Sequence, residues 1–207
     1  YAYEIRTKGY RLFLTTRAGQ GHAISQYLLG EAHYHGLYGL TEDTDEAVKW
    51  LGLAAKAGQG DAMLALGEHL LLLAAENDET ISADAVTEAV EWLTAAVKAN
   101  NYAAAYRLGA FYLDEDQAEY DTKRGLKFLR LAARNNETEA QADLGVLYEE
   151  GQHVRRSYKT AIAWYNKACE QGNHHGLLRL GLCYEQGLGV EGDHERAYKF
   201  FEDASEN

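Results

Sequence analysis

The stretch AQADLGVLYEEG at residues 140–151 decides the fold of this chain, because its pattern returns as GLLRLGLCYEQG at residues 176–187. Each copy carries Leu-Gly, a tyrosine four residues after the leucine, and a glycine three residues later. In this frame Leu-Gly falls at residues 29–30, 66–67, 108–109, 144–145 and 180–181, so the successive spacings are 37, 42, 36 and 36 residues. A recurrence of this length indicates one supersecondary unit repeated along the chain.

Further columns keep a fixed distance from these pairs. The positions 19 residues before the leucines hold Tyr10, Ala47, Ala89, Gly125 and Ala161. An aromatic column three residues later holds Phe13, Trp50, Trp92, Phe128 and Trp164, with Phe200 as the last copy. An alanine column four residues after that holds Ala54, Ala96, Ala132, Ala168 and Ala204. Spacings of three and four place these columns on one stripe of a helix, so we expect the aromatic side chains to fill the space between closely approaching helices.

The ends of this helix and its partner can also be predicted. Glycine or asparagine follows each of the first five aromatic residues by eight positions, which is typical of a left-handed C-cap. These caps are Gly21, Gly58, Asn100, Asn136 and Gly172. The Leu-Gly pair belongs to a partner helix, where a glycine costs about 1 kcal/mol relative to alanine, so its repeated use predicts a close helix contact. The extra residues of the second repeat surround Glu76–Thr80, which we predict to be a polar loop.

These columns resemble the Sel1-like repeat family, a relative of the tetratricopeptide repeats. The family motif runs Leu-Gly-x2-Tyr-x2-Gly, then a Gly-Val-x2-Asp loop, then Ala-x2-Trp/Tyr-x3-Ala-Ala-x2-Gly, and residues 187–193 and 161–172 are close to it. The resemblance weakens in the first two repeats, where His33 and Leu70 occupy the tyrosine column. It implies an all-α fold, an α/α solenoid (superhelix) of about five antiparallel helix pairs plus an N-terminal half repeat. We expect one domain over residues 1–207, with a half repeat at 1–21 and repeats at 22–58, 59–100, 101–136, 137–172 and 173–207.

Composition narrows the class of partner. With 46% hydrophobic residues and no proline, a helical protein is expected. The net charge of −12 argues against nucleic acid and anionic membranes as partners and permits a basic protein, although acidity also simply favours solubility. The longest apolar run, Leu70–Ala75, is too short to cross a bilayer. Because the chain starts at Tyr1 and ends with its last repeat, we expect it to be processed or part of something longer.

Candidate chemistry is weak throughout. The spacing Gly187-x-Gly189-x2-Gly192 matches a dinucleotide fingerprint only formally, since that fingerprint works between a strand and a helix. Glu31 and His35 could share a metal ion on one helix face, but the sequence places no third ligand, so we predict no metal site and no cofactor. No serine-hydrolase elbow, Walker loop or Cys-x2-Cys pair is present, so we predict no catalytic residues and no enzyme activity.

The two cysteines do not reproduce the disulfide in every repeat that some secreted relatives carry. Cys169 and Cys183 are expected to be small core residues on neighbouring helices, and a single bridge between them stays open.

In the related tetratricopeptide arrays the Leu-Gly helix lines the concave wall. By that analogy the exposed positions lie two residues before the leucine of each Leu-Gly, and two and five residues after it. We call this set the A-helix face and predict that it binds the partner: Tyr27, Glu31, Tyr34, Leu64, Glu68, Leu71, Tyr106, Leu113, Val146, Glu149, Leu178, Leu182 and Glu185. Leucine and tyrosine in an exposed row favour a binding surface, although some of these residues could instead pack against the neighbouring Leu-Gly helix.

The function predicted is a non-catalytic interaction scaffold or adaptor that binds a partner protein or peptide on this concave face, with glutamates selecting basic side chains. An alternative is an immunity or inhibitor protein that blocks a secreted bacterial toxin or enzyme. A third hypothesis, a cell-wall or lactam hydrolase, is disfavoured by the missing cysteine pattern. The resemblance implies bacterial envelope, secretion or signalling contexts, with a periplasmic or secreted location favoured over the cytoplasm, or eukaryotic quality control. The oligomeric state stays open.

Overall fold

The computed structural model describes residues 2–76 and 79–206, and within these ranges it contains eleven α-helices, one short 3-10 helix and no strand. The elements are α1 (Ala2–Gly19), α2 (Ala23–Tyr34), η1 (Leu37–Gly39), α3 (Thr44–Lys56), α4 (Gly60–Glu76), α5 (Glu79–Lys98), α6 (Tyr102–Leu113), α7 (Thr122–Arg134), α8 (Thr138–Glu150), α9 (Tyr158–Cys169), α10 (His174–Gln186) and α11 (His194–Glu206).

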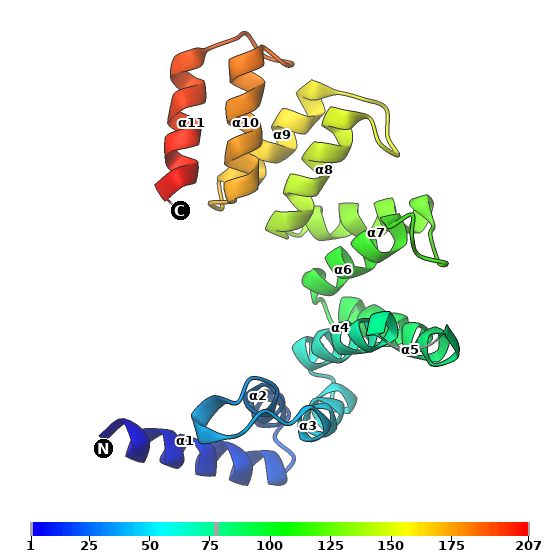
Figure 1. Cartoon of the computed structure of the whole chain (residues 1–207), viewed down its shortest axis with the longest axis vertical. Coiled ribbons are helices and arrows are strands. Elements are labelled where there is room, and N and C mark those ends of the chain that lie inside the picture. Colours follow the sequence, from blue (N-terminus) through cyan, green and yellow to red (C-terminus); the bar gives the residue numbers. More distant parts are fainter. Residues whose placement is uncertain (1, 77–78, 207) are drawn as a thin grey trace. The chain divides into compact units, whose positions relative to one another are not determined.

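The chain forms two compact units, residues 1–104 and 105–207. In the first unit α2 packs on α3 and α4 on α5, while α1 covers α2 and α3 joins the two pairs by packing on α4. In the second unit α8 pairs with α9 and α10 with α11, and α9 packs on α10 (Figure 1). The predicted all-α fold, an α/α solenoid of stacked helix pairs, is confirmed. The expectation of one domain with the repeat boundaries given above stays a prediction.

The close helix contact predicted at Leu-Gly is confirmed in every pair. Each glycine lies against the residue that directly follows the aromatic column. The contacts are Gly30–Leu51, Gly67–Leu93, Gly109–Leu129, Gly145–Tyr165 and Gly181–Phe201. A Cβ atom at Gly67 would lie 2.6 Å from Cγ of Leu93, closer than side chains approach one another, so only glycine leaves the required room.

The aromatic column lies beside this contact. Phe128 and Phe200 stack on Tyr112 and Tyr184 of the partner helices, so part of the column does fill space between helices as predicted. Phe13, by contrast, is 57% exposed, and the position against the glycine itself is not aromatic in the first three pairs. Leu51 and Leu93, one residue further on, are 2% and 0% exposed and fill that space. A step of one residue turns the side chain by about 100° around the helix, which moves it from the flank to the partner helix. The indole N–H groups of Trp50 and Trp92 instead donate to the carboxylates of Glu46 and Glu88, one turn earlier.

All five predicted C-caps adopt the left-handed conformation. Gly21, Gly58 and Gly172 have φ of 85°, 92° and 77°. Asn100 and Asn136 have φ of 64° and 65°, in the region that asparagine tolerates better than most residues. Each of these five helices therefore ends in the same left-handed conformation.

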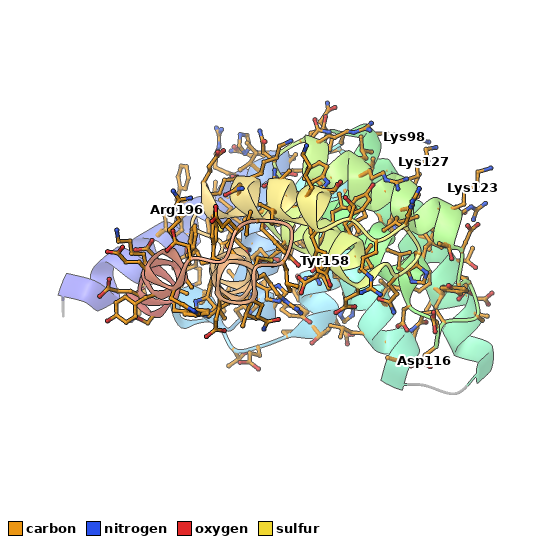
Figure 2. The ribbon with its side chains drawn as sticks, turned by 90° about the horizontal axis from the view of Figure 1, so that it is seen from above. Lys98, Asp116, Lys123, Lys127, Tyr158 and Arg196 are labelled. Carbon is orange, nitrogen blue, oxygen red and sulfur yellow. The ribbon has the colours of Figure 1, made fainter. Side chains whose placement is uncertain are left out.

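Helix α7 shows how the sequence selects the buried side. Leu126, Leu129 and Ala133 follow one another at spacings of three and four and are buried. Lys123 and Lys127 lie on the other side and extend away from the ribbon into solvent (Figure 2). A helix divided in this way gains its stability by covering the neighbouring helix with its apolar stripe.

The extra residues of the second repeat lengthen its helices, so the prediction of a polar loop over Glu76–Thr80 was wrong for most of that segment. Helix α4 has 17 residues and extends to Glu76, and α5 has 20 and begins at Glu79. The run of leucines and alanines before Glu76 favours helix strongly, which overrides the polar composition that follows it. Asn77 and Asp78 lie outside the described residues.

Candidate functional site

Five predicted residues of the A-helix face line one cavity of about 360 Å³ in the first unit. They are Tyr27, Glu31 and Tyr34 from α2 and Leu64 and Glu68 from α4. Spacings of four and three keep the three α2 residues on one stripe, and the two α4 residues occupy the same register on their helix. Each of the five is half-buried, so each side chain is both held by the fold and open to a ligand.

The cavity also has walls that the sequence did not predict. Asp61, His69 and Leu72 come from α4, His35 follows α2, and Leu51 and Ala65 are partly or fully buried beneath them. Asp61 precedes Leu64 by three residues and Glu68 by seven, so it belongs to the same stripe and could have been found by extending the A-helix face one turn. Leu71, by contrast, is half-buried but does not line this cavity.

Aromatic edges fix one side of the cavity. The ring of Tyr34 meets those of His35 and His69 edge-on, with centroids 5.1 and 5.9 Å apart. Such edge-to-face pairs stabilise a particular ring orientation. Leu72 completes this side and is 56% exposed, an unusually open position for a leucine.

Three carboxylates give the cavity its charge. Burial raises the pKa of Glu31, as do the negative charges of Glu68 and Asp61, while the nearby His35 lowers it. Burial also raises the pKa of Tyr27, and the same three carboxylates raise it further. The carboxylates are therefore near enough to repel one another and to charge the space between them negatively.

Neutral donors hold the Asp61 carboxylate in place. The side-chain amide of Asn101 donates to Oδ1 at 2.8 Å, and that of Gln59 donates to Oδ2 at 3.2 Å. His35 lies 3.8 Å from Glu31 and forms an ion pair with it only when the imidazole is protonated. Among the described residues no group of three or more histidine, cysteine, aspartate or glutamate side chains could hold a metal ion.

In the second unit, residues of the A-helix face form hydrogen bonds with other residues of the same unit. Leu113 and Val146 line a cavity of about 250 Å³ together with Asp143. Burial raises the pKa of Asp143, while a hydrogen bond from Tyr106 and the nearby His175 lower it. Tyr106 is thus engaged within the unit.

The carboxylate of Glu149 has its polar partners within the second unit. The buried hydroxyl of Tyr165 donates to Oε2 of Glu149, and the guanidinium of Arg179 lies 3.5 Å from Oε1. The glutamate and arginine side chains are only 15% and 27% exposed. Of the remaining predicted residues, Leu178 and Leu182 are half-buried on α10, and Glu185 is exposed.

A second cavity in the first unit reflects the departure from the motif at Leu70. In α10–α11 the ring of Tyr184 stacks on Phe200 with centroids 5.5 Å apart, and the guanidinium of Arg196 covers it at 5.6 Å. In α4–α5 the corresponding residues include Leu70 and Trp92, and a cavity of about 620 Å³ lies beside them, bounded by α3. Leucine in place of tyrosine removes the aromatic stack, and this open space lies in the region of the missing ring.

The other sequence features are structural. Cys169 and Cys183 are free thiols, and burial raises the pKa of each to about 11, which disfavours the reactive thiolate. The segment 187–192 follows helix α10 and leads into α11, so its glycines serve a turn between helices.

Stacked antiparallel helix pairs, each closed by a glycine contact, define a class of protein: the helical-hairpin repeat proteins. The model of the Sel1 repeat matches residues 23–59, 60–101, 103–137, 138–173 and 174–207. The chain belongs to the Sel1 repeat family. Sel1 repeats suggest protein–protein interaction, and they generally act as non-catalytic scaffolds. Within the described part of the chain, no helix has the length and apolar character needed to cross a membrane.

Solved structures with the same fold come from several bacteria. A Sel1 repeat protein from Oxalobacter formigenes is 25% identical with a TM-score of 0.85, over 97% of this chain and 79% of its own. A protective antigen present in uropathogenic Escherichia coli strains, which displays an SLR fold, is 28% identical with a TM-score of 0.79 over 95% of this chain. The chain spans only 40% of the length of that antigen. An immunity protein from Pseudomonas aeruginosa, with 15% identity and a TM-score of 0.63 over 99% of this chain and 80% of its own, shares the fold alone. A comparison with curated proteins gave no match.

Proposed function

We propose that this chain is a non-catalytic scaffold that binds a partner protein or peptide on the A-helix face. One observation carries the proposal: five residues of this face, on the Leu-Gly helices of two successive repeats, line a single cavity in the first unit. Binding surfaces of this kind combine an apolar base with a few polar groups that orient the ligand.

The composition of the cavity supports a protein ligand. Tyr27 and Tyr34 offer large rings with polar tips, the type of side chain that most often anchors protein complexes. Leu64 and Leu72 add apolar surface that the fold leaves partly open to water. Burying this surface under a partner would remove it from water, which is favourable.

The test is quantitative capture from a lysate of the source cells with the wild-type chain and a Leu64→Asp variant as baits, followed by titration of the purified partner. Leu64→Asp places a charge in the cavity, so we expect the partner to bind about tenfold more weakly or worse. Leu53→Asp is the matched control, because Leu53 is an exposed leucine that lines the other cavity of the same unit. Circular dichroism checks that both variants keep their helices.

Unchanged affinity of the folded Leu64→Asp variant would contradict the proposal for the first unit. A tight one-to-one complex that stops the turnover of a captured enzyme would narrow the scaffold to an immunity or inhibitor protein. Hydrolysis of a cell-wall or lactam substrate by the purified chain would contradict the non-catalytic assignment.

A further inference from the structure

We infer that the solvent side of α7 binds an acidic segment of a partner protein through a row of basic side chains. The row consists of Lys123, Lys127, Arg130 and Arg134, and we call it the basic stripe. It lies in the second unit and is separate from the A-helix face. The inference therefore goes beyond the proposed function and does not depend on it.

The four side chains lie along one line of the helix. Their spacings of four, three and four residues bring them onto one stripe, opposite the buried Leu129. At a rise of 1.5 Å per residue the stripe is about 16 Å long. Lys123, Lys127 and Arg134 are exposed and Arg130 is half-buried. Figure 2 shows Lys123 and Lys127 extending away from the ribbon, where a partner can reach them.

The repeat does not require basic residues at these positions. The corresponding helices of the other four repeats carry mixed, neutral or acidic side chains there. The equivalent residues are Asp45, Lys49, Gly52 and Lys56 on α3; Thr87, Glu91, Thr94 and Lys98 on α5; Lys159, Ala163, Asn166 and Glu170 on α9; and Glu195, Lys199, Glu202 and Glu206 on α11. Four cations in a row are therefore a property of α7 alone and not of the fold.

The fold leaves these four charges without an acidic partner. Among the described residues no ion pair or hydrogen bond engages any side chain of the basic stripe. Neighbouring cations are paired locally: Arg124 lies 3.6 Å from Asp121, and the equivalent Arg196 lies 3.2 Å from Asp193.

This arrangement destabilises the isolated helix. Like charges three or four residues apart on a helix repel one another. The chain has 32 acidic residues against 20 lysines and arginines, so carboxylates are plentiful, yet none neutralises the basic stripe within the described structure. A bound segment rich in aspartate or glutamate would remove the repulsion and form charge-assisted hydrogen bonds in its place.

The surroundings favour a short acidic protein segment over other anions. Glu119 precedes α7 and Glu137 and Glu139 follow it, and the whole chain has a net charge of −12. A nucleic acid or an anionic membrane would extend past the stripe and meet this negative charge. The stripe also offers no aromatic ring for base stacking and no apolar side chain for insertion into lipid. An extended run of about five residues, at about 3.4 Å each, matches its length.

The experiment titrates the isotope-labelled 207-residue chain with an acetylated and amidated hexaglutamate peptide. The hexaglutamine analogue has nearly the same shape without the charge. Binding is followed by NMR through the backbone amide signals of residues 122–134. We expect the glutamate probe to shift these signals and the glutamine probe to leave them unchanged, because the attraction depends on charge.

A pair of variants makes the test specific to the basic stripe. Lys127→Gln/Arg134→Gln should weaken binding of the glutamate probe about fivefold, because two of the four cations are lost. Lys49→Gln/Lys56→Gln changes the same repeat positions on α3 and alters the net charge equally, so it should leave the affinity unchanged. The first variant should also keep the urea midpoint of the wild type or exceed it, since it relieves repulsion.

Equal binding of the glutamate and glutamine probes, or shifts confined to other helices, would overturn the inference. An equal loss of affinity in both double variants would show that general charge attracts the probe and not the basic stripe. A lower urea midpoint of Lys127→Gln/Arg134→Gln would assign the stripe to the fold instead. Tighter binding of α7 to oligothymidylate or to phosphatidylserine vesicles than to the glutamate probe would overturn the choice of a protein partner.

Discussion

The A-helix faces of the two units carry glutamates at repeat positions, but the side chains around these glutamates differ between the units. In the second unit Glu149 lies between the hydroxyl of Tyr165 and the guanidinium of Arg179, and little of it is exposed. In the first unit Glu31 lines an open cavity, and the cationic group beside it is His35, which pairs with it only when the imidazole is protonated. The backbone of the repeat therefore leaves the role of a face position undecided. The neighbouring side chains determine how far a glutamate on this face supports the fold.

The largest loss of stability is expected from a change at Gly145, which lies against the ring of Tyr165. In Gly145→Ala the new methyl group would meet the ring of Tyr165, whose hydroxyl donates to Glu149. We expect the free energy of unfolding to fall by about 2 kcal/mol, because the cost of overpacking outweighs the better helix propensity of alanine. Urea denaturation followed by circular dichroism measures the loss.

The matched control for this change is Gly30→Ala in the first unit. Its methyl group would meet the flexible side chain of Leu51, which can partly rearrange. The expected loss is smaller, about 1 kcal/mol. If Gly145→Ala were as stable as the wild type, the fit between Gly145 and Tyr165 could not be what fixes the Glu149 pair.

The next effect concerns the hydroxyl of Tyr165 itself. Tyr165→Phe removes the donor to Glu149 at a position that is 0% exposed and leaves a part-buried carboxylate oxygen without that partner. We expect a loss of about 1 to 2 kcal/mol in the free energy of unfolding. Tyr27→Phe in the first unit should cost less than about 0.5 kcal/mol, since no hydrogen bond engages that hydroxyl in the described structure. Equal losses from both changes in thermal unfolding would erase the distinction between the two faces.

Much of this framework could be predicted from the sequence because it depends on short and repeated spacings. The C-caps at Gly58 and Asn100 and the contact at Gly67 follow from columns that recur in register. The buried residue was displaced by one position, from Trp92 to Leu93, because the pattern identifies a stripe of the helix but does not decide which edge of the stripe faces the partner helix.

The sequence could bring candidate residues together only where one helix sets the geometry. Tyr27, Glu31 and Tyr34 share a stripe of α2 and line one cavity, and their role in binding stays a prediction. The pairing of Glu149 with Arg179 joins residues 30 positions apart on different helices, so it depends on how successive helices stack and on side-chain rotamers. Periodicity carries no information about either.

Removing the arginine beside Glu149 tests how much this ion pair stabilises the second unit. Arg179→Gln breaks a partly buried ion pair, so we expect the free energy of unfolding to fall by about 0.5 to 1 kcal/mol. Urea denaturation followed by circular dichroism measures the loss. An unchanged free energy of unfolding would show that the pair of Glu149 and Arg179 does not support the fold.

The smallest effect should appear as a change with pH. In the folded chain the pKa of Glu31 is raised from its ordinary value of 4.5, chiefly by burial and also by Glu68 and Asp61, so the folded state holds this proton more tightly than the unfolded chain. The stabilising contribution is complete below pH 4.5 and is lost as the pH rises through the raised pKa. Glu31→Gln removes that loss, and at pH 7 the variant should be more stable than the wild type by less than about 1 kcal/mol.

Asp114→Asn should behave in the opposite sense, because hydrogen bonds from the Gln117 side chain and the Asp116 backbone lower the pKa of Asp114, and the stability it provides is lost as the pH falls. Urea denaturation of both variants between pH 3 and pH 7 would test the contrast. If the difference in the free energy of unfolding from the wild type changes with pH in the same direction for both variants, the folded state does not raise the pKa of Glu31.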